Sequence, residues 1–179
     1  MSRGWPICVG ANEPDVGQYE EIKEVNYVPG SCFLIKRKVV EIAGLLDESY
    51  FAYWDDQDYC TRARKAGFTV VYTPHAKIWH KVPIKLKPWY KTLRRRDQVN
   101  ATPYSLYLVT RNNFKFMKKH ATTRQYRSFL IYFFGYRFWF TTGSCLVYRR
   151  DVEQLIAFYR GIRDGVSNSD SGAKLYMRD

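Results

Sequence analysis

Apolar and polar positions follow different patterns in the two halves of the chain. In the first half, apolar residues come in short runs typical of strands, at residues 25–35, 68–72 and 76–80. The first of these runs is broken by Pro29-Gly30, which indicates a bend where the backbone comes close to something else. Residues 1–24 carry little periodic signal and are expected to be mostly loop.

Two short helices are predicted between these strands. The first covers residues 36–43 and is expected to end at Gly44. The second covers residues 56–66, with Asp55 as its N-cap, acidic side chains in its first turn, basic ones in its last turn, and Gly67 directly after it. The order strand, helix, strand predicts a fragment of an α/β sheet.

The second half is predicted to be mostly helical, because residues 104–120 and 151–162 place apolar side chains at helical spacing. Between them, residues 129–148 are crowded with Phe, Tyr and Trp over nearly the length of a membrane span. Arg137 in the middle and several small polar residues argue against a crossing. We expect this segment to lie at a membrane interface or to pack against the first half, and the polar tail from Gly165 to be mobile.

Composition limits the class of protein. A chain of 179 residues has the size of one ordinary domain, and 46% hydrophobic with 26% charged residues excludes a generally disordered chain. Its four cysteines contain no C-x-x-C pair, so no zinc or dithiol site is signalled. The N-terminus lacks an apolar signal segment, which predicts a cytoplasmic location.

The net charge of +12 is concentrated in one stretch of the chain. Residues 1–80 carry 9 Lys and Arg against 11 Asp and Glu, whereas residues 81–150 carry 16 basic side chains and a single acid, Asp97. We therefore predict two regions, residues 1–83 and residues 84–179, with different electrostatic roles.

The basic, aromatic-rich region has three interpretations. Its run of cations can be a solvated face over a helical core, a surface that docks on anionic lipid headgroups, or a nucleic-acid-binding surface. No recognised nucleic-acid-binding motif accompanies the run, so we expect no nucleic-acid partner. The cations concerned are Lys85, Lys87, Lys91, Arg94, Arg95 and Arg96.

An acidic cluster at the start of the second helix is the main candidate for chemistry. Three carboxylates, Asp55, Asp56 and Asp58, fall within four residues. A helix N-terminus keeps a carboxylate ionised, and such a group can act as general base for a hydroxyl nucleophile. The alternative is structural: Asp55 caps the helix and Asp58 pairs with Arg62 one turn later.

Five motifs in register resemble the second half of a family-2 glycosyltransferase catalytic domain, over roughly residues 25–80. The nearest resemblance is to bacterial and archaeal rhamnosyltransferase-like and galactofuranosyltransferase-like enzymes. The motifs are Tyr-Val-Pro-Gly-Ser-Cys-Phe-Leu-Ile-Lys-Arg from Tyr27, Gly-Leu-Leu-Asp-Glu-Ser-Tyr-Phe from Gly44, Trp-Asp-Asp-Gln-Asp from Trp54, Arg-Ala-Arg-Lys-Ala-Gly from Arg62, and Pro-His-Ala-Lys-Ile-Trp-His from Pro74.

The resemblance implies part of a GT-A, Rossmann-like α/β fold, followed here by a basic, aromatic-rich helical region. It also implies inverting transfer of a sugar from a nucleotide-sugar to an acceptor hydroxyl of a glycan or lipid-linked glycan. In that family the second acid of the motif is the general base, which corresponds to Asp56, and the closing histidine, His80, ligates a divalent metal, Mn²⁺ or Mg²⁺. The remaining expected site residues are Asp55, which supports the acceptor or orients the base, and the substrate-binding set Trp54, Trp79, Gly30, Ser31, Asp58 and Arg62. Without the resemblance, a lone histidine such as His80 is more often structural or exposed.

The family's nucleotide-binding half has no counterpart in residues 1–24, where Asp15 and Glu20-Glu21 lack the Asp-x-Asp spacing. We therefore expect a C-terminal portion of an enzyme, whose other half is a separate segment or an upstream gene product. Alone, it is expected to bind nucleotide-sugar weakly or not at all. A lipid-linked acceptor would place it peripherally on the inner face of the cell membrane. The alternative is a non-catalytic fragment that serves as a membrane-surface or interaction module.

Overall fold

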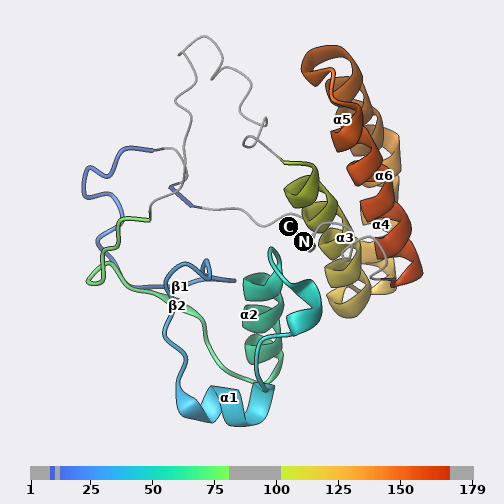
Figure 1. Ribbon diagram of the computed structural model, residues 1–179. Helices are drawn as coiled ribbons and strands as arrows, with labels where there is room; N and C mark the ends of the chain where they lie inside the picture. The colour runs from blue at the N-terminus through green and yellow to red at the C-terminus, as the bar shows by residue number, and fades with distance from the viewer. Residues whose placement is uncertain (1–8, 11–12, 81–101, 170–179) are drawn as a thin grey trace.

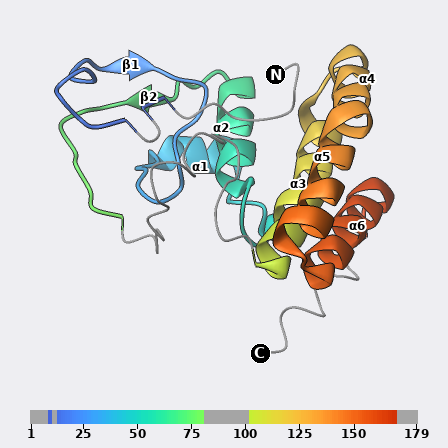
Figure 2. The ribbon, with the colours of Figure 1, turned by 90° about the horizontal axis from the view of Figure 1, so that it is seen from above.

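The computed structural model describes residues 9–10, 13–80 and 102–169. Figure 1 shows a small two-stranded sheet beside helices α1 and α2, with a group of helices, α3 to α6, on the far side of α2 from the sheet. Helix α3 lies between α2 and the remaining helices, as the view from above also shows (Figure 2). This arrangement agrees with a partial α/β fold followed by a helical region.

The sheet is smaller than predicted. Strand β1 (Lys23–Glu24) pairs antiparallel with β2 (Val71–Tyr72), and Val25 N donates to Val70 O at 2.9 Å just beyond them. The predicted strands over most of residues 25–35 and over residues 76–80 are wrong, because these segments have no regular structure. A strand needs a partner, and only the two short segments find one here.

The helices of the first half follow their local signals. Helix α1 (Arg37–Ala43) ends at Gly44, whose φ of 76° favours glycine. A 3₁₀ turn, η1 (Glu48–Tyr50), precedes helix α2 (Asp55–Lys65), and Gly67 follows α2 as predicted. The N-cap of α2 is Trp54 in a left-handed conformation, so the prediction that Asp55 is the cap is wrong.

The second half forms a helical hairpin packed on α3 (Pro103–His120). Helix α4 (Thr123–Tyr132) continues through the π-helical segment η3 (Phe133–Arg137), α5 (Phe138–Gly143) and the π-helical η4 (Ser144–Arg149). The chain reverses at Arg150, and Asp151 caps α6 (Val152–Ser167). None of the described helices has both the length and the apolar character needed to span a bilayer.

One hydrophobic core joins the two predicted regions. Tyr50 and Trp54, from the first region, are buried in one cluster with six residues of the second, Phe114, Phe116, Met117, Phe129, Phe133 and Phe158. The boundary proposed between residues 83 and 84 lies outside the described residues and stays a prediction. The two regions are nevertheless packed together around shared side chains.

Helices α3 and α6 approach closely because two glycines of α6 face α3. A Cβ added at Gly161 would lie 2.7 Å from Tyr107 O, and one at Gly165 would lie 2.8 Å from Phe114 Cβ. Gly165 is buried within a helix that continues to Ser167, so the expectation that the mobile tail begins at Gly165 is wrong at its start.

Candidate active site

Asp56 is fixed by a hydrogen bond across 26 positions of sequence. The backbone N–H of Gly30 donates to Asp56 Oδ2 at 2.9 Å, and the N–H of Gln57 donates to Oδ1 at 2.8 Å. The structure thus brings together two predicted site residues, the candidate base and the glycine of the bend. A Cβ at residue 30 would lie 3.4 Å from Asp56 Cβ and 3.3 Å from the Phe33 ring, so a larger side chain there would fit tightly.

The Asp56 carboxylate is half-buried but still reachable, which suits a group that must meet a substrate. Burial raises its pKa above the ordinary 3.8, with a further contribution from the charge of Asp55, while the N–H groups of Gly30 and Gln57 oppose the rise. A carboxylate with a raised pKa is a stronger base than an exposed one. Asp55 is also half-buried, and Ser31 is exposed beside Gly30.

The loop that leads into α2 has a strained backbone. Phe51, Tyr53 and Trp54 have positive φ angles of 63°, 65° and 71°, which non-glycine residues rarely adopt. Such conformations persist only where the surroundings enforce them, and they gather at functional sites. In this protein the strained residues directly precede Asp55 and Asp56.

Two polar side chains of α3 hold this loop in place. Asn112 Nδ2 lies 2.9, 2.8 and 2.9 Å from the carbonyl oxygens of Tyr50, Ala52 and Tyr53. Arg111 donates through Nη2 to Ser49 O at 2.9 Å and to Tyr50 O at 3.1 Å, and through Nε to Asn112 Oδ1 at 2.9 Å. We call Arg111 and Asn112 the α3 clamp; both side chains are buried.

Asp58 occupies a buried charge network rather than an open surface. Its side chain is fully buried and accepts hydrogen bonds from Arg62 Nε at 2.8 Å and from Tyr50 Oη at 3.3 Å. Lys119 Nζ and His120 Nε2, from the end of α3, lie 2.8 and 2.7 Å from its Oδ1. Burial opposes ionisation, but the hydrogen bonds from His120, Lys119 and Arg62 outweigh it and hold the pKa of Asp58 well below its ordinary value.

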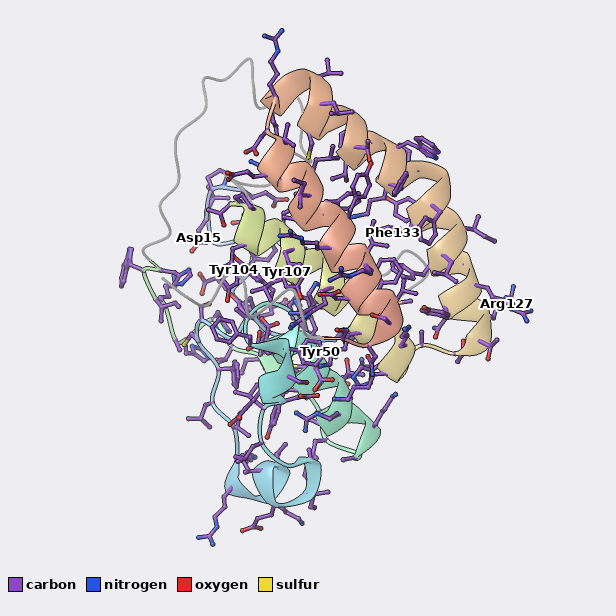
Figure 3. The ribbon with its side chains drawn as sticks, turned by 45° about the vertical axis from the view of Figure 1, so that its right-hand side comes forward. Asp15, Tyr50, Tyr104, Tyr107, Arg127 and Phe133 are labelled. Atoms are coloured by element: carbon purple, nitrogen blue, oxygen red, sulfur yellow. The ribbon has the colours of Figure 1, made fainter. Side chains whose placement is uncertain are left out.

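This network bears out the structural alternative for Asp58 and Arg62. Arg62 also donates to the carbonyl oxygens of Ala43 and Leu45. It therefore ties α2 to the end of α1, and Asp58 ties α2 to α3. Neither arrangement suits direct substrate contact, and we regard both residues as supports of the site. Figure 3 shows Tyr50 at the junction of the two halves.

The two candidate sugar-stacking residues differ sharply in exposure. Trp54 is 5% exposed and packs against Phe116, with ring centroids 5.2 Å apart, so its ring is part of the core and is not available to a sugar face. Trp79 is 89% exposed and remains available. The expectation of a stacking role is therefore wrong for Trp54 and stays a prediction for Trp79.

The structure does not bring His80 to the acidic cluster. The segment after β2 runs away from α2 in both ribbon views (Figures 1 and 2), and Lys77 pairs there with Asp15 and Glu20 at 3.9 and 3.5 Å. His80 is exposed, and within the described part of the chain no three His, Cys, Asp or Glu side chains gather to hold a metal ion. These residues do not form a metal site by themselves.

The sequence analysis missed the α3 clamp. Its signal is the polar run Arg111-Asn112-Asn113 inside an otherwise apolar helical pattern. All three side chains are buried in the structure. Buried polar groups require partners, so this run indicated that α3 meets backbone groups of another segment.

Comparisons with known proteins show which proteins this chain is similar to. Residues 15–100 match the family model for glycosyltransferase like family 2. The low-salt glycan biosynthesis hexosyltransferase Agl10 of Haloferax volcanii is 25% identical over 157 residues, which cover 85% of this chain and 46% of that protein. The N-acetylglucosaminyl-diphospho-decaprenol L-rhamnosyltransferase of Mycobacterium tuberculosis is 40% identical over 58 residues, or 32% of this chain and 19% of that protein.

The chain spans less than half the length of these relatives. No solved structure matches it significantly. The family match includes the bend at Gly30, helix α2 and the segment to His80, which are the motifs that carried the resemblance. Across residues 15–100, the chain is similar to the glycosyltransferases of family 2.

Proposed function

We propose that this chain supplies the acceptor-side half of an inverting glycosyltransferase, with Asp56 as general base. The donor is a nucleotide-sugar and the acceptor a hydroxyl of a glycan or lipid-linked glycan. The observation that carries the proposal is the Asp56 carboxylate, held by Gly30 at the start of α2 within the region that matches the family. Support for a lipid-linked acceptor comes from the rhamnosyltransferase relative, whose name specifies a diphospho-decaprenol substrate.

In the proposed reaction the acceptor oxygen attacks the anomeric carbon of the donor sugar. A new carbon–oxygen bond forms, the bond to the nucleoside diphosphate breaks, and that leaving group keeps the electron pair. The acceptor proton passes to Asp56, whose raised pKa suits it to receive a proton. The neighbouring Asp55 and Ser31 are proposed to position the acceptor.

The nucleotide-binding contacts are proposed to come from a further segment that packs against residues 13–80. Helix α1 buries none of its residues, and several large apolar side chains of this part are open to solvent. The most exposed are Leu34 at 90%, Trp79 at 89%, Val16 at 79% and Leu45 at 77%. Such a surface is typical of a face that another part of the protein covers. Metal ligation by His80 is a prediction for that complete enzyme, and no step above depends on it.

The proposal is tested in an enzyme that contains both halves, by comparing Asp56→Asn with the wild type. Turnover is expected to fall about 10²- to 10⁴-fold, because the acceptor proton loses its base. Binding of the nucleotide-sugar is expected to be unchanged. Asp15→Asn is the matched control, since Asp15 lies far from α2 in Figure 3 and should leave turnover unaffected.

Full turnover in Asp56→Asn would contradict the assignment. If the complete enzyme transfers no sugar under any of the tested donors and acceptors, the alternative of a non-catalytic interaction module is favoured. Salt-sensitive retention of oligonucleotides would instead favour nucleic-acid binding.

A further inference from the structure

The end of the helical hairpin carries an exposed apolar surface. We call it the hairpin tip; it consists of Trp139, Phe140, Leu146, Val147, Val152 and Ile156, which are 67%, 46%, 53%, 66%, 63% and 43% exposed. The tip surrounds the turn between η4 and α6 and points away from α2 in Figures 1 and 3. Helix α3 lies between the tip and α2 (Figure 2).

The exposed residues of the tip are separate from the side chains that form the core of the hairpin. The inner side of the same hairpin is filled by Phe133 and Phe158, which are 1% and 0% exposed and stack with centroids 6.1 Å apart. The rings of Phe138 and Tyr159 pack with their centroids 5.6 Å apart, and Thr142 Oγ1 lies within hydrogen-bond distance of Tyr159 Oη, at 3.2 Å. The apolar side chains of the tip are therefore exposed in addition to this packed inner side, and no described segment covers them. An apolar patch of this kind on a protein surface marks a binding site.

Two of the arginines of the hairpin, Arg149 and Arg150, accompany this face. Residues 123–167 contain seven arginines, no lysine and three acids. Of the acids, Asp164 is buried against Tyr107 and Arg163, Asp151 caps α6, and Glu153 is the exposed one. Arg149 and Arg150 stand at the turn, between Val147 and Val152 of the tip. Among the described residues no ion pair involves Arg124, Arg127, Arg150 or Arg160.

We propose that the hairpin tip docks on an anionic lipid bilayer, with its apolar side chains in the headgroup region and Arg149 and Arg150 on lipid phosphates. The combination favours lipid over protein or nucleic acid. A Trp beside Phe and aliphatic side chains is typical of a surface at a membrane interface, and arginine adds attraction to phosphate. Docking at the tip leaves α2 uncovered. Membrane docking itself does not depend on the proposed function. Only its suggested purpose, which is to bring the site to a lipid-linked acceptor, rests on that function.

Flotation of the full chain with liposomes tests this inference. One set of vesicles contains neutral phosphatidylcholine alone, and the other adds about 30 mol% phosphatidylglycerol. We expect co-flotation with the anionic vesicles that weakens as salt is raised. The double variant Trp139→Ser, Val147→Ser should reduce it about tenfold, and Arg150→Gln should reduce it severalfold. Matched controls are Trp79→Ser and Arg37→Gln, which change exposed residues far from the tip and should float like the wild type.

Circular dichroism and the unfolding midpoint establish that the tip variants are folded. Equal flotation of the tip variants and the controls, or no flotation of the wild type, would overturn the inference. It would also be overturned if the tip variants abolished a self-association seen without lipid, because the tip would then be a protein interface. Sugar transfer to a soluble acceptor, measured in the enzyme that contains both halves, separates the two proposals. If flotation is lost but transfer is retained, the role proposed for Asp56 still holds. If flotation is retained but transfer is lost, the role proposed for the tip still holds.

Discussion

The side-chain amide nitrogen of Asn112 lies 2.8 Å from the carbonyl oxygen of Ala52, although 60 positions separate the two residues. This contact fixes the strained loop before α2 to the middle of α3. The helical half is thereby part of the candidate site's scaffold, although the expected site residues fall in the first half. The position of Asp56 follows from the geometry of that loop together with the hydrogen bond from Gly30.

Asn112→Ala is expected to lower the free energy of unfolding by about 1–3 kcal/mol, because the carbonyl oxygens of Ala52 and Tyr53 lose their donor and that of Tyr50 keeps only Arg111. Chemical denaturation of the full chain measures this change. Asn26→Ala is the matched control, since Asn26 is exposed, and its effect should stay within about 0.5 kcal/mol. Equal effects of the two substitutions would show that the clamp does not hold the loop.

Asp58 predicts a specific acid sensitivity. Its pKa is lower in the folded protein than the ordinary 3.8, so the folded state binds this proton less readily than the unfolded chain does. The stabilisation is therefore complete above about pH 4 and is lost as the pH falls toward the lower folded pKa. Asp58→Asn should lower stability at neutral pH by about 3 kcal/mol and flatten the dependence below about pH 4.

Unfolding curves collected from neutral to acidic pH test this prediction. Glu20→Gln is the control, because Glu20 pairs with Lys77 on the exposed surface, where such a pair contributes about 0–1 kcal/mol. If Asp58→Asn keeps the wild-type pH dependence of stability, the buried network around Asp58 is not the source of the acid sensitivity.

The packing of α6 on α3 predicts that Gly161→Ala and Gly165→Ala each destabilise the fold by about 1–3 kcal/mol. The reason is that the added methyl groups would meet the backbone or Cβ of α3 at less than 3 Å. Gly143→Ala is the matched control, because a Cβ there meets nothing within 4 Å, and it should be neutral or stabilise by up to about 1 kcal/mol. The midpoint of thermal unfolding should fall in Gly161→Ala and Gly165→Ala but not in Gly143→Ala. An unchanged midpoint in the first two variants would contradict the prediction.

The proposal that the nucleotide-binding contacts come from a further segment predicts weak donor binding by this chain alone. Calorimetric titration with uridine- and thymidine-diphosphate sugars, with manganese present, should give no binding in the micromolar range. Uridine, ribose and diphosphate contacts are expected on the other segment. A micromolar dissociation constant for this chain would contradict that division of the site.

The features that the sequence predicted well are those with local causes. Helices α1, α2 and α3 begin and end close to their expected bounds because caps, glycines and apolar spacing act within a few residues. Helix α6 begins where expected but continues past the predicted end at residue 162 to Ser167. The strands were overpredicted because pairing depends on distant segments, and only Lys23–Glu24 and Val71–Tyr72 meet. The π-helical segments η3 and η4 carry no comparable local signal.

The candidate site also contains residues that the sequence predicted correctly and residues that it did not. Asp56 and Gly30 were expected together, and the structure joins them by a hydrogen bond. The sugar-stacking role expected for Trp54 is wrong because its ring packs on Phe116 of α3, a contact with a distant segment that a linear motif does not reveal. The α3 clamp depends on contacts between residues about sixty positions apart, so only its buried polar composition could have signalled it.

The central claim is that the Asp56 carboxylate accepts the acceptor's proton, and the pH dependence of kcat/KM in the two-half enzyme tests it most directly. The account predicts an acidic limb whose pKa lies above the ordinary aspartate value of 3.8, and the loss of that limb from the residual activity of Asp56→Asn. An acidic limb that stays at the same pH in Asp56→Asn would contradict it.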